Sequence, residues 1–191
     1  MISNNQKDDL LEATIELLKE TEHPEKVTSR QIASRAGVNL AMINYYFGSK
    51  DELTSQALSA IFTIPIDKLQ ALRNPAEAPK ERLKNFLIYI SQIVIRYKRY
   101  TKLYIPHLLL EADISQPQLI LTEIREHFGS EKSEEQCRLI AYQLISFLQL
   151  IFYRSDAFML YSGININLEN EAERLINTEL NLLLPDSIVE E

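Results

Sequence analysis

The sequence predicts an all-α protein. Its 191 residues include only four glycines and seven prolines, and helix-forming residues dominate. Apolar residues recur at spacings of three and four, which indicates helices that bury one face. We therefore expect about nine helices, with a three-helix domain over residues 1–48 and a larger helical domain over residues 49–191.

Three capping-box patterns predict where helices begin. In such a box, a Ser or Thr and a Glu or Gln three residues later satisfy each other's free backbone amides. The pattern occurs at Thr28 with Gln31, at Ser49 with Glu52, and at Ser133 with Gln136.

These start signals, together with glycine and proline positions, predict the boundaries of the N-terminal helices. The first is expected over residues 7–20, with acidic side chains in its early turns where the helix dipole favours them. After a loop at residues 21–26, the second begins at Thr28 and ends at Gly37, because glycine readily adopts a left-handed exit. The third spans residues 39–47. The fourth spans residues 49–73 as a connector and buries Leu53, Ala57, Ala60 and Ile61. We expect a kink or a break in it near Thr63, because Pro65 interrupts it.

The C-terminal helices are expected at residues 80–100, 103–112, 115–128, 133–161 and 168–184. The helix at 133–161 is apolar around most of its circumference, so it must be covered on more than one side. We expect the last two helices to form a homodimer as a four-helix arrangement. The alternative is that these two helices bury each other within one subunit.

Residues 28–53 have the pattern of a helix-turn-helix. Gly37 and Phe47 are expected to hold its shape. If Ile43 points inward, the helical period points Ala41 and Tyr45 outward. Residues 26–50 contain four cations and no acidic residue, although the whole chain carries a net charge of −7. If the hairpin only packed into a helical core, this basic window would have no explanation. We therefore expect a small basic surface on a protein that is acidic as a whole.

The run AGVNLAMINYYFGSKDEL resembles the DNA-binding signature of the TetR/AcrR family of one-component bacterial regulators. The resemblance rests on Ala36, Gly37 and Val38, then Tyr45, Tyr46 and Phe47, then Lys50 and Leu53. Many members carry Ser, Lys and Gly after the Val and a Tyr where Asn44 stands. This chain departs from them at Asn39, Leu40, Ala41 and Asn44, so its base preference cannot be copied from such relatives.

The resemblance implies a dimeric repressor that binds a palindromic operator in double-stranded DNA and is released by an unidentified small-molecule effector. The expected phosphate contacts are Thr28, Arg30, Tyr46 and Lys50. The expected groove contacts are Leu40, Ala41, Met42, Asn44 and Tyr45, and Ser29 and Asn39 complete the DNA-binding set.

The middle helices have the composition of a small-molecule cavity, with apolar walls and scattered polar tips. The candidate lining residues are Phe86, Tyr89, Gln92, Ile93, Arg96, Tyr97, Tyr104, His107 and Glu111. An ordinary core with partly exposed tyrosines would explain the same residues, and the resemblance favours the cavity. The basic run at residues 96–102 is explained by placement at a helix C-terminus, or alternatively by an anion or partner patch.

The sequence lacks the motifs that are typical of several other classes of protein. The sequence contains no phosphate-binding glycine loop, HExxH, CxxC or GxSxG, so we expect no enzyme, cofactor or metal site. His107 with Glu111 and Glu123 with His127 lie four apart, but a di-iron bundle needs further inward carboxylates. Cys137 is the single cysteine, and no apolar run is long enough for a bilayer, so we expect a cytoplasmic protein without membrane partners. The rival hypothesis is an all-α ligand carrier or enzyme that binds no specific DNA sequence.

Overall fold

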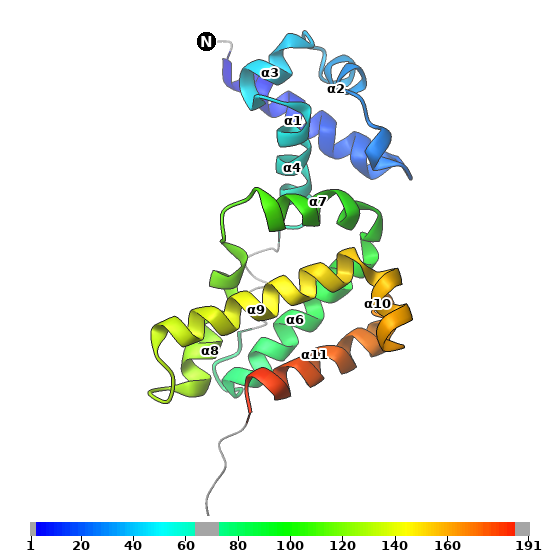
Figure 1. The fold of residues 1–191 in the computed structure, drawn as a ribbon. Helices are drawn as coiled ribbons and strands as arrows, with labels where there is room; N and C mark the ends of the chain where they lie inside the picture. Colours follow the sequence, from blue (N-terminus) through cyan, green and yellow to red (C-terminus); the bar gives the residue numbers. More distant parts are fainter. Residues whose placement is uncertain (1–2, 64–72, 186–191) are drawn as a thin grey trace, which may run out of the picture. The chain divides into compact units, whose positions relative to one another are not determined.

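The computed structural model describes residues 3–63 and 73–185, which form ten α-helices and two short 3-10 helices (Figure 1). The predicted all-α class is therefore confirmed. The chain divides into two compact units. Unit 1 comprises Met1–Thr63 with Arg99–His107, and unit 2 comprises Ile64–Lys98 with Leu108–Glu191. Within the described ranges, no helix is long and apolar enough to cross a bilayer.

Unit 1 is built from four N-terminal helices and the middle of a later one. Its elements are α1 (Ser3–Glu20), η1 (Pro24–Lys26), α2 (Ser29–Ala36), α3 (Ala41–Phe47), α4 (Lys50–Ile61) and part of α7 (Lys98–Leu110). Helices α1, α2 and α4 each contribute fully buried residues, among them Leu10, Ile32 and Leu53. Because α1 begins at Ser3, Asp8 and Asp9 lie beyond its first turn, and the expected dipole effect of these acids is wrong.

The turn between α2 and α3 has the predicted geometry. The Thr28 hydroxyl accepts a hydrogen bond from the Gln31 amide, and the Gln31 side chain accepts one from the Thr28 amide, so the capping box is complete. Gly37 ends α2 in the left-handed region at φ 67°. The second predicted box is only half formed. Ser49 accepts from the Glu52 amide, whereas the Glu52 carboxylate accepts from the Gln56 side chain.

The buried face of α4 differs from the prediction at its end. Leu53, Ala57 and Leu58 are buried, while the expected inward residue Ala60 is exposed and Ile61 is half-buried. The helix ends at Ile61, so its last turn does not continue the apolar stripe. The interruption predicted near Thr63 is present, because the helix ends at Ile61 and Thr63 is not helical, while Pro65 itself lies outside the described residues.

Unit 2 is a helical bundle whose core lies between α6, α8, α9 and α11 (Figure 1). Its elements are α6 (Pro79–Arg96), η2 (Gln116–Ile120), α8 (Leu121–Phe128), α9 (Glu134–Tyr153), α10 (Ser155–Ser162) and α11 (Glu169–Leu183). The third capping box, Ser133 with Gln136, is complete and begins α9 as predicted.

Two long predicted helices are each broken by one non-helical residue. The first ends at Arg96 because Tyr97 has φ −105° and ψ 31°, and α7 starts at once, so Pro106 lies inside α7 rather than in its first turn. The second ends at Tyr153 because Arg154 has φ −102° and ψ 29°. Both breaks lie in short polar stretches, at residues 96–99 and 154–156, which a continuous helix can also carry, so the sequence pattern does not distinguish a break from an unbroken helix there. Similarly, the helix predicted at 115–128 begins as η2, with Pro117 near its start.

The break at Tyr97 also changes the interpretation of the basic run. Arg96 lies at the C-terminus of α6, where the helix dipole favours a cation. Lys98 and Arg99 instead lie in the first turn of α7, and Lys102 in its second, where the dipole disfavours them. Placement at a helix C-terminus therefore explains Arg96 alone.

Candidate nucleic-acid interface

Helix α3 is anchored on one side and open on the other. Ile43 and Phe47 are buried, with 2% and 6% of their surface exposed. Ala41 and Asn44 are exposed, and Tyr45 is 75% exposed. The inward and outward faces expected from the helical period are therefore present.

The first turn of α3 is held by Asn39. Its side-chain oxygen accepts a hydrogen bond from the Ala41 amide at 2.9 Å, so this oxygen starts the helix and the amide donors of Asn39 stay available. Leu40 is the N-cap residue of α3 and is 45% exposed, and Met42 is half-buried. Leu40 and Met42 thus frame an exposed apolar edge beside Ala41.

The last turn of α3 packs on the start of α1. The Tyr46 hydroxyl lies 3.5 Å from Oε1 of Gln6, and the ring of Tyr45 stands edge-on to that of Tyr46 at 4.9 Å. The Lys7 ammonium lies 5.5 Å from the centroid of the Phe47 ring. Gln6 and Lys7 were not among the predicted site residues, because no sequence pattern connects them to residues 40 positions away.

The N-terminus of α2 carries two of the predicted phosphate-contact residues, Thr28 and Arg30, and the predicted DNA-binding residue Ser29. The Thr28 hydroxyl is part of the capping box, and it also donates to Oε1 of Gln31 at 2.8 Å. Ser29 is half-buried, and Arg30 is exposed, with no ion pair to any residue that the structure describes. The first turn of a helix attracts anions through its free amides. Arg30 and this turn therefore both favour an anionic ligand such as a phosphate.

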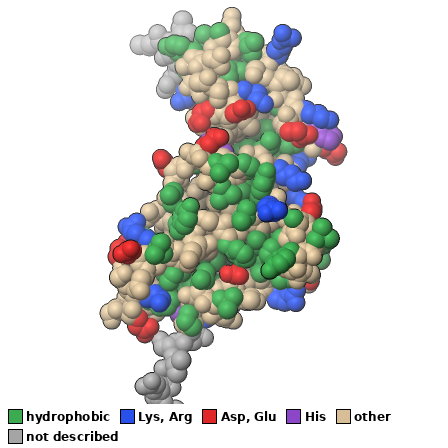
Figure 2. Space-filling view, viewed as in Figure 1, with side chains coloured by type: hydrophobic (Ala, Val, Ile, Leu, Met, Phe, Trp, Pro, Cys, Tyr) green, Lys and Arg blue, Asp and Glu red, His purple; other side chains and the backbone are tan. Residues whose placement is uncertain are grey.

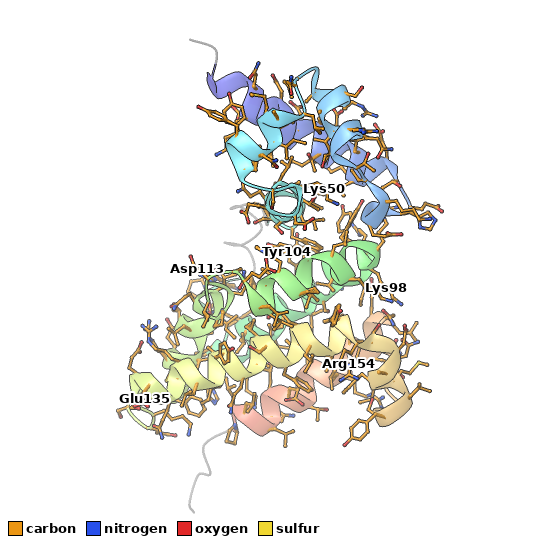
Figure 3. The ribbon with its side chains drawn as sticks, turned by 45° about the horizontal axis from the view of Figure 1, so that its top comes forward. Lys50, Lys98, Tyr104, Asp113, Glu135 and Arg154 are labelled. Atoms are coloured by element: carbon orange, nitrogen blue, oxygen red, sulfur yellow. The ribbon has the colours of Figure 1, made fainter. Side chains whose placement is uncertain are left out.

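Lys50 opens α4, as Figure 3 shows, and is partly held within unit 1. Its ammonium donates to the Val27 carbonyl at 3.4 Å and lies 3.8 Å from Oδ1 of Asp51. Because an ammonium has three donors, these contacts orient Lys50 without using all of its hydrogen-bonding capacity.

Arg35 does not add to the basic footprint. Its guanidinium donates to Glu16 at 3.2 Å and to Glu20 at 2.8 Å, both in α1. The hydrogen bond that Arg35 donates to Glu20 is the main cause that raises the pKa of Arg35, and the same bond lowers the pKa of Glu20. Arg35 therefore joins α2 to α1, and the cations of the basic window that remain are Lys26, Arg30 and Lys50.

Another contact within unit 1 joins α7 to α1. The Tyr100 side chain is fully buried, and its hydroxyl donates to the Leu18 carbonyl at 2.6 Å. Tyr100 and Leu18 are separated by 82 positions, and Tyr100 lies within the basic run at residues 96–102. No pattern in the sequence predicts this contact.

The predicted effector residues lie in both units. Phe86 belongs to the core of unit 2. In unit 1, Tyr104 stacks on Phe62, with ring centroids 5.2 Å apart, and the His107 ring lies 6.4 Å from that of Tyr104. A groove of about 580 Å³ in unit 2 is lined by none of the nine predicted residues. Its lining is Ile114, Pro117, Gln118, Leu121, Glu134, Glu135, Arg138, Leu139, Ala141 and Tyr142. The effector-pocket assignment stays a prediction.

The two candidate metal pairs have other neighbours. Buried Glu123 pairs with Arg73 at 3.4 Å, and Nε2 of His127 lies 3.2 Å from the Pro185 carbonyl. Among the described residues, no three His, Cys, Asp or Glu side chains gather as a metal site would require.

Comparison with known proteins agrees with this geometry. Residues 10–57 match the profile described as bacterial regulatory proteins, tetR family. The fold resembles that of the Thermus thermophilus repressor FadR, solved with lauroyl-CoA, at a TM-score of 0.70 and 18% identity over 97% of this chain and 96% of that one. A TetR regulator from Rhodococcus sp. RHA1 gives a TM-score of 0.66 and 21% identity over 97% and 98%. No curated protein matches the sequence at a significant level.

Proposed function

We propose that this chain is a transcriptional regulator of the TetR family, that it binds a palindromic operator as a homodimer, and that it represses transcription until a small molecule releases it. The match of residues 10–57 to the tetR family profile supports the proposal. The observation that carries the proposal is the outward face of α3. Exposed Ala41, Asn44 and Tyr45 stand on a short helix whose opposite face is buried.

These side chains suit the major groove. An amide such as that of Asn44 can pair with adenine through both its donor and its acceptor, and small apolar groups such as Ala41 can meet a thymine methyl. Tyr45 offers a hydroxyl to a base edge or a phosphate. We assign direct contacts with bases to this face, together with Leu40, Met42 and the amide donors of Asn39.

Phosphate contacts are assigned to the ends of α2 and α4 that flank α3. Arg30 at α2 and Lys50 at α4 supply the cations, and Thr28, Ser29 and Tyr46 supply polar groups. A footprint of so few cations predicts a modest salt slope, because each neutralised phosphate contributes about one unit.

A dimer would present two copies of α3 to one face of the DNA. Half-sites about one helical turn apart would then match the symmetry of the protein. We place this regulator in the cytoplasm with its DNA, and we assign it no catalytic role.

For the effector, we propose a small molecule that binds within the helical region beyond α4. The lauroyl-CoA bound by the Thermus thermophilus repressor makes an acyl-CoA the first ligand to test here. A ligand that binds the DNA-free conformation more tightly than the DNA-bound one would lower the affinity for the operator. The largest possible decrease is the ratio of the ligand's affinities for the two conformations.

The test is the selection of bound fragments from random-sequence DNA by the purified protein. A Tyr45→Ala, Lys50→Ala variant is run in parallel, and Lys19→Ala, an exposed lysine in the last turn of α1, serves as the matched control. The proposal expects an enriched palindrome for the wild type and the control, and its loss in the double variant. If the folded wild type enriched nothing at low salt, the proposal would fail in favour of a ligand carrier.

A further inference from the structure

The predicted cationic phosphate contacts of unit 1 gather at the start of α2. Thr28 caps this helix, and Arg30 lies in its first turn. The Lys50 ammonium reaches the same place, because it donates to the Val27 carbonyl at 3.4 Å. A helix in the major groove has a DNA backbone on each side of it, since the groove is about 12 Å wide. Contacts gathered at one place suit one backbone, so a contact with the second backbone needs another element of unit 1.

The last turn of α3 lies against the start of α1, which Figure 1 shows beside α3. Tyr45, which is 75% exposed, stands edge-on to Tyr46, with ring centroids 4.9 Å apart. The Tyr46 hydroxyl lies 3.5 Å from Oε1 of Gln6. The Lys7 ammonium lies 5.5 Å from the centroid of the Phe47 ring. The start of α1 therefore continues the outward face of α3 through Tyr46.

Lys7 is available to an anion. It is exposed and forms no ion pair with any residue that the structure describes. A ring face such as that of Phe47 attracts an ammonium without accepting a conventional hydrogen bond. The N–H donors of Lys7 therefore remain for a phosphate, while the ring keeps the ammonium beside the last turn of α3.

The acidic residues of α1 point away from Lys7. At about 100° per residue, Asp8, Asp9 and Glu12 lie about 100° to 160° around the helix from it. Asp8 and Glu12 are exposed on the side of α1 opposite buried Leu10. On the face of unit 1 that Figure 2 shows, Lys and Arg side chains appear at separate places and not as one patch. A phosphate contact in unit 1 thus depends on where a single cation lies.

We propose that Lys7 is a phosphate contact with double-stranded DNA, on the backbone that passes the α1 side of α3. The inference rests on the proposed function, because it needs DNA against the outward face of α3. The Tyr46 hydroxyl lies on the same side of the hairpin, with Gln6 as its acceptor. Lys7 lies outside the basic window at residues 26–50 and is followed by two acids, so the charge pattern of the sequence does not indicate it.

The dependence of DNA binding on salt tests this contact. Lys7→Met removes the charge and keeps an unbranched side chain against Phe47. It should lower the salt slope by about 0.9, because each neutralised phosphate contributes about that much. The same decrease is expected on the enriched operator and on a duplex of random sequence, since phosphate contacts carry no sequence information. Lys7→Arg should restore the slope, because the charge is kept.

Lys19→Met is the matched control. Lys19 is an exposed lysine in the last turn of the same helix, about 18 Å further along it. Its salt slope should equal that of the wild type. The melting temperature of each variant is measured alongside, so that a loss of folded protein is distinguished from a lost contact.

Ethylation interference locates the phosphate. Ethylation of single phosphates in the enriched operator should weaken the wild type at one position of each half-site that no longer affects Lys7→Met. This position should differ from the one that Lys50→Ala loses, because the Lys50 ammonium lies at the start of α2. The two lost positions should lie on opposite sides of the major groove.

Three results would overturn the inference. A folded Lys7→Met protein with an unchanged salt slope would leave Lys7 as a structural contact of Phe47 only. An equal decrease in Lys19→Met would show that the slope reports net charge and not a contact at Lys7. Loss of interference at the phosphate that Lys50 contacts would place both lysines on one backbone.

The same measurements separate this inference from the proposed function. If the wild type binds duplex DNA without enriching a palindrome, and Lys7→Met still lowers the salt slope, the phosphate contact stands and the operator is rejected. If the wild type enriches a palindrome and Lys7→Met keeps its slope, the proposed function stands and the contact is rejected. A wild type that binds no duplex at low salt would reject both.

Discussion

Both terminal nitrogens of the Arg35 guanidinium donate to the Glu20 carboxylate, at 3.0 and 2.8 Å. This bidentate pair joins the last turn of α2 to the end of α1. It is also the reason why Arg35, although it lies in the basic window, has its charge compensated within the protein.

The pair predicts opposite roles for two arginines of α2. Arg35→Ala should lower the melting temperature and leave the salt slope of operator binding unchanged. Arg30→Ala, its matched control, should reduce the salt slope by about one and leave the melting temperature unchanged. Thermal unfolding and operator binding at several salt concentrations measure both. A reduced slope in Arg35→Ala with unchanged melting would assign Arg35 to a phosphate instead.

The same pair makes part of the stability depend on pH. The pKa of Glu20 is lower in the folded protein than its ordinary value of 4.5. Its contribution is therefore complete above pH 4.5 and is lost as the pH falls through the lower folded pKa. The difference in melting temperature between the wild type and Arg35→Ala should therefore shrink as the pH falls below 4.5. It should also shrink at high salt, because the ion pair is exposed and salt screens it. A constant difference from pH 3 to pH 7 would be evidence against the ion pair as its source.

Gly37→Val should destabilise unit 1 by about 1–3 kcal/mol, because a β-branched residue resists positive φ. The cost is backbone strain and not a clash, since a Cβ at Gly37 would meet nothing within 4 Å. Gly37→Asn is the control, as asparagine tolerates the left-handed region better and should cost less. Melting temperatures test this order, and equal values for the two variants would show that the turn does not need its φ of 67°.

Asn44→Ala should relax base preference at one position of each half-site, with a loss of about 1–3 kcal/mol of discrimination there. The reason is that Asn44 is exposed on α3 with its amide free of any hydrogen bond that the structure describes. Binding to a panel of single-base operator variants gives the measurement. A preference profile identical to that of the wild type would remove Asn44 from base readout.

Lys50→Ala should weaken binding to every operator variant alike and lower the salt slope by about one. Lys50→Arg should restore most of the slope, because the charge is kept. If the loss were confined to one base position, Lys50 would contact a base and not the backbone.

Tyr100→Phe should destabilise unit 1 by about 1–3 kcal/mol, because it leaves the Leu18 carbonyl without its donor while keeping the ring. Tyr161→Phe, at a residue that is 90% exposed, is the matched control and should melt as the wild type does. Hydrogen exchange at the end of α1 should also accelerate in Tyr100→Phe. Unchanged melting and exchange would show that the hydroxyl contributes nothing.

Some of the structure could be predicted because its causes are local in the sequence. Capping boxes at Thr28 and Ser133, the left-handed Gly37 and the two faces of α3 each depend on residues within about one or two turns. Such features need only a helical period and a few hydrogen bonds between near neighbours. The helix-turn-helix and the outward set of Ala41, Asn44 and Tyr45 follow from them.

The remaining features depend on side chains that only the folded chain brings together. Arg35 meets Glu20, Tyr46 meets Gln6, and Tyr100 meets Leu18 across separations of 15 to 82 positions. The break at Arg154 likewise has no distinct signature, because the polar run Arg154, Ser155 and Asp156 can also occur in a continuous helix.

The sequence by itself thus determined the helical class, the helix-turn-helix hairpin and the residues of its outer face, because short-range hydrogen bonding and periodicity specify them. Only the tertiary structure decided which cation of the basic window pairs with carboxylates of α1 and which helix keeps large apolar side chains exposed. Both depend on what packs against each face, and packing between distant segments has no signature in local sequence.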